Sequence, residues 1–287
     1  MPRTMMATSP FSHLIPMPVV GLWDFDRHLI ERELRETLAS AAGQNPVHSC
    51  MEYAVLGQAQ RIRPLLAVRV GRLCGAPEEL VLRAAAAVEI LHSASLVVDD
   101  LPSMDDEQTR RGRPAAHLAF GEPTALLAAF GLVALAARSV IEQPCAKRYV
   151  AGQRHFQHAL LRTLDCCSLI GGQSLDLQLT GDHREAGRDA MNELKTVPLF
   201  LLAIEAGTAY AAAPSYPLLK RFGREYGVAF QLTDDYLDGE LKDRSRLSRQ
   251  FDLTRECLAP FGTGADPLAE LLDYLEKRAA AQDRRHR

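Results

Sequence analysis

The sequence predicts an all-α protein, a single domain of about ten or more helices. Most of the chain consists of stretches rich in Ala, Leu, Glu and Arg, which have high helix propensity. Apolar residues recur every three or four positions within these stretches, which is the period of an amphipathic helix. Alternating runs of β-branched residues, which would indicate strands, are nearly absent. No linker, repeat or low-complexity tract divides the chain, so one domain is expected.

The expected helices follow one another with short breaks between them. In the first, residues 28–42, Ile30, Leu34 and Leu38 repeat at four-residue spacing with charged residues between them. The other helical runs cover residues 78–98, 123–142, 154–179, 191–213, 216–238 and 266–282. Glycine, proline and polar residues mark the breaks at 181–189, 212–217 and 259–267.

Composition narrows the possible functions. The 287 residues are 47% hydrophobic, which suffices for one large core. The formal net charge of −3 lacks the basic excess of a nucleic-acid-binding protein, so no nucleic-acid partner is expected. Six scattered cysteines without CxxC pairing indicate reduced thiols in the cytosol.

The N-terminal segment is not typical of a targeting signal. Prolines interrupt residues 1–22, and the long apolar core of a signal peptide is missing, so we interpret this segment as a loose leader. The domain is expected over residues 23–287. Charged residues interrupt the other apolar runs before they reach the length of a bilayer, which predicts a soluble, cytoplasmic protein without a membrane span.

A concentration of carboxylates follows the helical run 78–98. Asp99, Asp100 and Asp105 lie close together in sequence, and Asp106 and Glu107 come directly after them. The C-terminal end of a helix carries partial negative charge, so carboxylates there need a compensating cation. Oxygen-rich clusters suit Mg²⁺ or Ca²⁺. Taken alone, this segment is explained equally well as a solvated acidic loop.

A second acidic segment strengthens the metal hypothesis. Asp234, Asp235 and Asp238 also close an apolar helical run. On a helix Asp234 and Asp238 are one turn apart, and they repel each other unless a cation bridges them. Two such segments, each after a helix that appears buried, predict two facing walls of one metal site.

Basic residues accompany the two acidic segments. Magnesium held by few carboxylates usually shares its coordination shell with substrate phosphates, and Arg and Lys neutralise the remaining phosphate charge. Each basic residue by itself is equally consistent with a solvated surface charge. As a set they predict a diphosphate site, and they are Arg61, Arg63, Arg110, Arg111 and Lys195.

These motifs resemble those of the all-trans isoprenyl diphosphate synthase family, the polyprenyl synthetases. The family's first aspartate-rich motif is similar to the segment LHSASLVVDDLPSMDDEQTRRGRPAAH. Its second is similar to FQLTDDYLD. The family's other conserved segments resemble, in the same order, GQAQRIRP, LIGGQSLDLQL and LKTVPLF. The resemblance therefore covers roughly residues 25–240. Within the family, the chain is most like bacterial carotenoid-type geranylgeranyl diphosphate synthases. The resemblance implies a helical bundle around a central cavity, and a homodimer.

The resemblance also implies a reaction: magnesium-dependent condensation of isopentenyl diphosphate with dimethylallyl, geranyl or farnesyl diphosphate. The implied catalytic residues are Asp99, Asp105, Asp234, Lys195 and Arg110. The implied magnesium ligands are Asp99, Asp100, Asp105, Asp234 and Asp238.

The same resemblance assigns the substrate contacts. The allylic diphosphate would contact Arg110, Lys195, Thr196 and Gln231, and isopentenyl diphosphate would contact Arg63, His92 and Arg111. Gln173 would lie near the reacting carbons. The alternatives are that His92 is a satisfied core histidine and that Gln173 is a polar residue of helix packing.

Two small residues bear on the length of the product. Ala94 and Ser95 lie about one helical turn before Asp99. The resemblance implies that Ala94 lines the floor beneath the allylic tail, where bulky aromatics are typical of enzymes that stop at fifteen carbons. Alanine therefore favours the twenty-carbon geranylgeranyl diphosphate over farnesyl diphosphate. The alternative is that Ala94 is only a helix former packed against a neighbour.

Two departures from the family pattern remove positive charge. Gln60 occupies a position where the family usually has a lysine for isopentenyl diphosphate. A second lysine, expected after Asp238, has no clear match; Lys242 is nearest, and Arg244 or Arg246 could compensate. These losses keep open a non-catalytic subunit that adjusts the product of an active synthase. A terpene cyclase would need an Asn/Ser/Glu motif in place of DDYLD.

Overall fold

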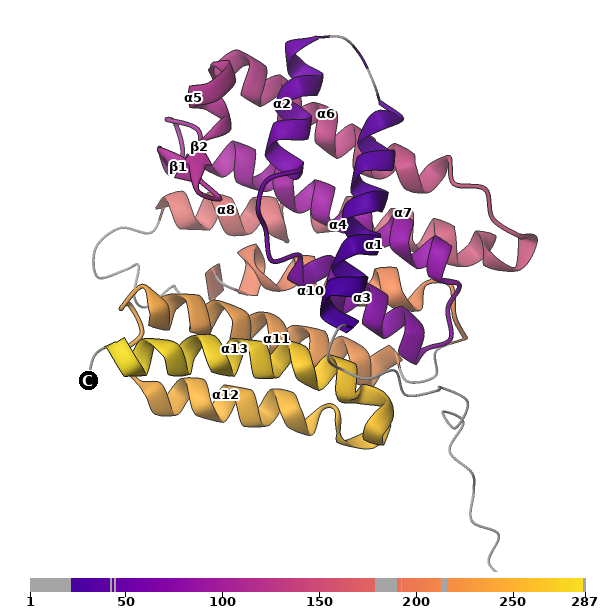
Figure 1. Cartoon of the computed structure of the whole chain (residues 1–287), viewed down its shortest axis with the longest axis vertical. Helices are drawn as coiled ribbons and strands as arrows, with labels where there is room; N and C mark the ends of the chain where they lie inside the picture. Colours follow the sequence, from indigo (N-terminus) through magenta and orange to yellow (C-terminus); the bar gives the residue numbers. More distant parts are fainter. Residues whose placement is uncertain are drawn as a thin grey trace, which may run out of the picture.

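The fold is all-α over the described part of the chain, as the sequence predicts. The computed structural model describes residues 22–285 except 42, 44, 179–189, 192 and 213–215. Its α-helices are α1 (Leu22–Ala39), α2 (Pro46–Val55), α3 (Ile62–Leu73), α4 (Glu78–Asp99), α5 (Ala116–Phe120), α6 (Glu122–Ile141), α7 (Val150–Thr163), α8 (Leu169–Gln178), α10 (Val197–Thr208), α11 (Tyr216–Leu237), α12 (Arg244–Glu256) and α13 (Asp266–Arg285) (Figure 1). The remaining elements are the 3-10 helices η1 (Lys147–Tyr149) and η2 (Ala259–Ala265), and a hairpin of β1 (Thr109–Arg110) and β2 (Arg113–Pro114).

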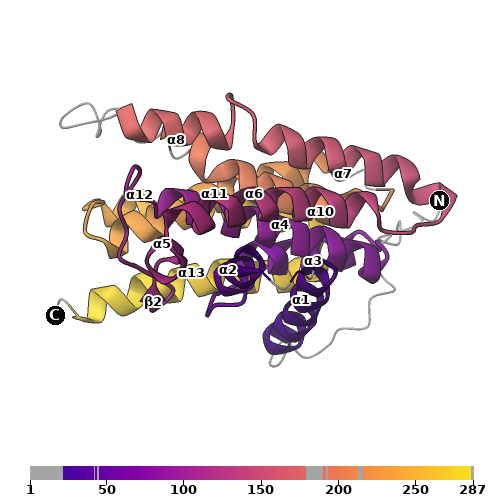
Figure 2. The same ribbon diagram turned by 90° about the horizontal axis from the view of Figure 1, so that it is seen from above.

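Helix α4 is the centre of the bundle. It packs against α1, α3, α6 and α10, and Figure 2 shows it between α6 and α3. The small residues Ala84, Ala85, Ala86 and Ala87 are all buried, which lets neighbouring helices approach α4 from several sides. The C-terminal end of α4, with Asp99, is therefore held between other helices.

Three helices at the C-terminal end of the chain form a layer along one side of the bundle. Helices α11, α12 and α13 lie side by side in Figure 1, and they contact one another. The buried Tyr226 of α11 donates its hydroxyl to the carbonyl of Leu271 in α13 at 3.0 Å. Helix α10 packs between this layer and α3, and in this way it brings α11 close to the end of α4.

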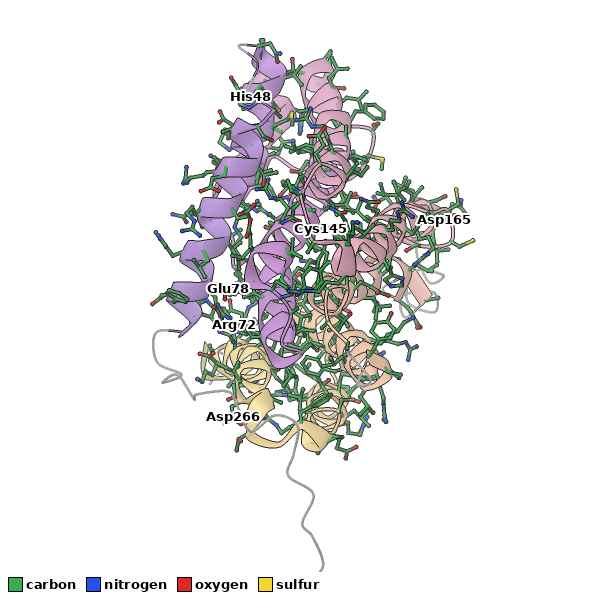
Figure 3. The ribbon with its side chains drawn as sticks, turned by 90° about the vertical axis from the view of Figure 1, so that its right-hand side faces the viewer. His48, Arg72, Glu78, Cys145, Asp165 and Asp266 are labelled. Carbon is green, nitrogen blue, oxygen red and sulfur yellow. The ribbon has the colours of Figure 1, made fainter. Side chains whose placement is uncertain are left out.

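The structure differs from the expected helix over residues 154–179. The chain turns after α7, where the amides of Leu164 and Asp165 donate to carbonyls three residues earlier, and α8 then begins at Leu169. Asp165 lies at the edge of the molecule in Figure 3. Gly171 allows the turn to pack directly on α8, because a Cβ there would lie 1.8 Å from the carbonyl oxygen of Cys166. Periodicity alone did not indicate this interruption.

The structure confirms some of the predicted helix positions and adds elements that were not predicted. Helices α1, α4, α6, α11 and α13 lie where the periodic runs predicted them. The runs did not single out α2, α3, α12 or the hairpin. The expected leader lies outside the described residues except for its last residue, at which α1 begins, and the expected break at 181–189 also lies outside them.

Two helices are long and apolar enough to cross a membrane by length and composition alone, namely α4 and α6. Charged residues still interrupt both helices, Arg83 and Glu89 in α4 and Arg138 in α6. In α4, 72% of the apolar window is buried within the chain, as in the core helix of a soluble protein. In α6 the buried share is 44%, and its exposed face carries Leu127 and Phe130.

A buried ion-pair network joins α1, α3 and α13. Asp26 and Arg69 have fully buried side chains that meet at 3.2 Å. Arg69 also contacts Glu270 at 2.8 Å and donates to the carbonyl of Pro267 at 2.6 Å. Arg72 pairs with Asp26 too, and it reaches Glu78, its neighbour in Figure 3. Each buried charge therefore has an opposite charge beside it, as burial requires.

This network predicts a large cost when one partner is removed. Replacing Arg69→Met should lower the free energy of unfolding by about 3–5 kcal/mol, because the carboxylates of Asp26 and Glu270 lose a buried partner. The control is Arg32→Met, which removes an exposed pair with Glu36 and should cost about 1 kcal/mol or less. Urea unfolding measures both variants, and equal losses would contradict the assigned role of Arg69.

Candidate active site

A polar cavity of about 420 Å³ lies between α4 and α11 and is bordered by the starts of α3 and α10. Asp99 lines it from the end of α4, and Asp234 lines it from the last turn of α11. The structure thus brings the two acidic segments to one cavity. Nine other expected site residues line the same cavity, and they are Arg61, Arg63, His92, Ser95, Arg110, Arg111, Lys195, Thr196 and Gln231. Gln60 lines it as well.

The first acidic segment leads directly into a tight hairpin. The two central residues of the hairpin, Arg111 and Gly112, have φ values of 54° and 77°, as in a type I′ turn. This turn points Arg110 back at Asp100, whose carboxylate it contacts at 2.9 and 2.5 Å. The adjacent positive charge in the sequence therefore neutralises the second aspartate, so Asp100 faces the hairpin and does not line the polar cavity.

Lys195 lies beside Asp99 and Asp105 of the first acidic wall. Its Nζ lies 3.9 Å from Asp99, 4.0 Å from Asp105 and 2.8 Å from Asp176. Asp176 was not singled out from the sequence. It follows Gln173 by three residues on the same helix, so a carboxylate on that helix face was the available signal. Asp105 takes part through Lys195 without lining the cavity.

Burial shifts the acid–base properties of both walls. Burial raises the pKa of Asp99 to about 6; the charge of Lys195 opposes this shift, and Asp105 adds to it. Burial also raises the pKa of Asp234, against the opposing effect of Arg278. Burial alone would lower the pKa of Lys195, but the neighbouring carboxylates, Asp99 first, raise it above its ordinary value. Each wall therefore presents carboxylate oxygens whose negative charge the neighbouring cation only partly neutralises.

The second acidic wall is tied to α10 and α13. Arg278 of α13 places Nη1 at 3.0 Å from Asp234. Gln231 donates to Asp235 at 2.8 Å and accepts from Thr196 at 2.7 Å. Asp238 follows the end of α11 and is not among the residues that line the cavity. Among the described residues, no three His, Cys, Asp or Glu side chains gather closely enough to form a metal site by themselves.

A basic group occupies the other end of the cavity. Arg63 approaches His92, with Nη1 3.2 Å from Nε2, and its guanidinium lies over the rings of Phe200 and Phe230, at 4.6 and 5.5 Å from their centroids. Burial, reinforced by the charge of Arg63 and other arginines, lowers the pKa of His92 well below its usual value. His92 is therefore neutral and accepts a hydrogen bond from Arg63 at Nε2.

One buried glutamate organises this basic group. Glu89 of α4 contacts Arg61 at 2.6 Å and Arg111 at 3.3 Å. Arg61 borders the cavity, and its fully buried side chain also binds Glu31 and the carbonyl of Val55. Glu89 was missed in the sequence, although a lone acid within a buried apolar run is itself an unusual signal.

A second, apolar cavity of about 390 Å³ adjoins the polar one. Ser95 and Asp99 line both cavities, and Ala94 and Gln173 line the apolar one. The remaining lining is almost entirely hydrocarbon and includes Leu91, Val98, Leu126, Ala129, Phe130, Val133 and Ile170. A ligand with a polyanionic head and a hydrocarbon tail fits this pair of chambers.

Several known proteins are similar to this chain in sequence. Residues 44–252 match the polyprenyl synthetase family. The chain is 34% identical to geranylgeranyl diphosphate synthase of Pantoea ananas over 77% of its length and 74% of the relative's. It is 31% identical to a probable farnesyl diphosphate synthase of Sinorhizobium fredii, over 87% and 86% of the two chains. It spans 59% of a longer plant relative, geranylgeranyl pyrophosphate synthase 4 of Arabidopsis thaliana, at 32% identity.

A solved structure agrees with these sequence relatives. The crystal structure of an FPP/GFPP synthase from Zymomonas mobilis superposes with a TM-score of 0.82 and 29% identity, covering 90% of this chain and 99% of that one. Sequence, fold and the paired polar and apolar cavities agree, and the chain therefore belongs to the polyprenyl synthetase family of prenyltransferases.

Proposed function

We propose that this chain is a magnesium-dependent trans-prenyltransferase that condenses isopentenyl diphosphate with allylic diphosphates, with geranylgeranyl diphosphate as main product. One observation carries the proposal: the polar cavity between two acidic walls opens beside an apolar cavity, and Asp99 lines both. This arrangement suits a substrate whose charged head and hydrocarbon tail must be held at once.

The acidic residues fit magnesium. The carboxylate of Asp99 is largely buried. The ammonium group of Lys195 lies 3.9 Å away, too far for a close hydrogen bond, so the carboxylate oxygens are free to bind a hard metal ion. Asp99, Asp105 and Asp234 would hold the metal, with Asp100 and Asp238 nearby. Few protein ligands gather at one point, as expected for Mg²⁺, which keeps waters and substrate phosphates in its shell. When bound, Mg²⁺ supplies Lewis-acid stabilisation of the diphosphate leaving group.

The basic residues divide between two substrates in this proposal. Arg110, Lys195, Thr196 and Gln231 lie near the acidic walls and would hold the allylic diphosphate. Arg63, His92 and Arg111 would hold isopentenyl diphosphate at the other end. Glu89 fixes Arg111, so this group is preorganised before the substrate binds.

The reaction needs no protein nucleophile. The allylic carbon–oxygen bond breaks, a carbon–carbon bond forms to isopentenyl diphosphate, and a proton leaves for the departing diphosphate. The chain contributes orientation and a fixed field. Gln173 lines the apolar cavity near Asp99, and its buried amide has no hydrogen-bond partner among the described residues, which suits a group beside the reacting carbons.

Residues 23–287 are proposed as one cytoplasmic catalytic domain that forms a homodimer. The exposed apolar residues Leu127 and Phe130 of α6 support an interface, because 56% and 67% exposure is high for hydrophobic side chains. Sedimentation of the purified chain distinguishes a dimer from a monomer. Turnover by the chain alone, with product analysis, separates the enzyme from a non-catalytic subunit, which would act only with a partner.

Removing either wall should abolish the reaction. Asp99→Ala and Asp234→Ala should each lower turnover by several orders of magnitude, because each removes a carboxylate from the proposed metal site. Circular dichroism should show an intact fold, and Glu36→Ala, on the exposed side of α1, serves as the control. Near-normal turnover in either wall variant would show that the two-wall metal site is wrong.

The pKa of Asp99 predicts how the stability of the metal-free protein depends on pH. Because the folded-state pKa is raised to about 6, the folded protein binds more protons than the unfolded chain between about pH 4 and 6. This contribution to stability is present at acidic pH and is lost as pH rises through about 6. Asp99→Asn should therefore be more stable than wild type near pH 8, by at most about 3 kcal/mol.

The same comparison near pH 4 provides the control, because residue 99 is then neutral in both folded proteins and the cost of burying its charge is absent. Thermal unfolding in the presence of a chelator measures the difference at each pH. A stability difference that stays constant from pH 4 to pH 8 would mean that Asp99 does not titrate in this range.

The product length depends on the buried Ala94, which lines the apolar cavity. Ala94→Tyr should fill the cavity and shift the main product from twenty to fifteen carbons without eliminating the first condensation. Overpacking could cost about 1–3 kcal/mol, so the melting temperature is measured alongside. A well-folded variant that keeps the wild-type product would remove this argument and leave farnesyl diphosphate equally supported.

A further inference from the structure

No residue of the loop that connects α11 to α12 is among the described residues that line the polar cavity, and its lysine, Lys242, is exposed. Only residues 238–243 join α11 to α12, and their backbone is committed to the turn: the amides of Glu240 and Leu241 both donate to the carbonyl of Asp235. Asp243 then caps α12 by accepting from the amides of Ser245 and Arg246. This short connection has little length with which to reach over the cavity.

One basic residue suggested as a substitute is engaged elsewhere. Arg244 lies with Nε 3.4 Å from Asp283, and its guanidinium lies 5.6 Å from the ring centroid of Tyr236. Tyr236 donates its hydroxyl to the same Asp283. These contacts fasten the start of α12 to α13 and draw Arg244 away from Asp234.

Helix α13 supplies a cation in place of the loop. Tyr226 donates to the carbonyl of Leu271, and Gln282 donates to the carbonyl of Leu237 at 3.1 Å. Both pairs are 45 residues apart in sequence, so α13 runs parallel to α11 in a constant register. Figure 1 shows the two helices side by side. This register brings Arg278 beside Asp234.

The contact between Arg278 and Asp234 is only partly exposed. Nη1 of Arg278 lies 3.0 Å from Oδ1 of Asp234, and the two side chains are 24% and 32% exposed. The guanidinium also lies 6.0 Å from the ring centroid of Tyr274. Because hydrogen bonds fix the register on both sides of residue 278, this arginine is held at the cavity wall and does not sample the surface freely.

We propose that Arg278 is a diphosphate-binding residue: it neutralises Asp234 in the metal-free protein and pairs with the substrate diphosphate when this is bound. The inference rests on the proposed function. A guanidinium presents five N–H donors in a planar fork, so it can contact a carboxylate and a phosphate oxygen at the same time. Helix α13 thereby supplies positive charge at a cavity wall that no residue of the α11–α12 connection lines.

The competing interpretation is that Arg278 only fastens α13 to α11. If Arg278 only holds α13 against α11, its removal lowers the thermal stability of the protein by the same amount with and without bound diphosphate. A diphosphate-binding role instead changes the affinity for an anion, and the positive charge is the property that matters. Binding of inorganic diphosphate, measured beside thermal stability, separates the two roles.

The experiment compares wild type, Arg278→Met and Arg278→Lys by calorimetric titration of inorganic diphosphate in the presence of Mg²⁺. Arg278→Met should weaken binding about tenfold or more, because one charge-assisted contact is lost. It should also raise the KM for the allylic substrate by more than it lowers kcat. Arg278→Lys should recover most of the affinity, since it keeps the charge.

The matched control is Arg255→Met on α12. Arg255 also pairs with α13, through Asp273 at 3.0 Å and Glu276 at 2.6 Å, but on the exposed surface. Its removal should leave diphosphate affinity unchanged. If Arg278→Met does not fold, Arg278→Gln, which keeps a hydrogen-bond donor for Asp234, replaces it under the same criteria.

Two results would overturn the inference alone: diphosphate affinity within about twofold of wild type in folded Arg278→Met, or no recovery in a thermally stable Arg278→Lys. A wild-type chain that neither binds diphosphate with Mg²⁺ nor turns over substrate would overturn the proposed function itself. The two failures are therefore distinguishable.

Discussion

The site depends on holding several carboxylates together at the ends of two helices. Helix C-termini are unfavourable places for negative charge, and Asp99, at the end of α4, is largely withdrawn from water. Lys195 makes the arrangement possible, because its ammonium group contacts Asp99, Asp105 and Asp176. On the opposite wall Arg278 does the same for Asp234. Each wall is thus stabilised by a cation from a neighbouring helix.

This dependence explains why the cavity has two chemically distinct ends. Glu89 holds Arg61 and Arg111 at the basic end, whereas Lys195 and Arg278 lie at the acidic end. The apolar cavity begins where the acidic wall stops, at Ser95 and Asp99. The polar and the apolar cavity therefore meet at one turn of α4, and the helix that forms the core also sets their boundary.

Local patterns in the sequence predicted the all-α fold, and the resemblance to a known family supplied most of the residues that line the cavity. Apolar periodicity marked the long helices. The fold brings Asp99, Asp234, Arg63, His92 and Lys195, which lie in separate motifs, to one cavity. The missed features have another origin. The turn after α7 rests on a close contact at Gly171 that periodicity does not report. The position of Arg278 depends on the register of α13 against α11, which no local pattern encodes.

The network around Arg69 has a consequence for how the protein is made. The buried guanidinium of Arg69, in α3, contacts Asp26 in α1. It also contacts Glu270 and donates to the carbonyl of Pro267, which follows Arg69 by 198 residues. Helix α3 is synthesised before α13, so until α13 follows, the guanidinium of Arg69 lacks its contacts with Glu270 and Pro267. The ion-pair network around Arg69 is therefore complete only after α13 has been synthesised.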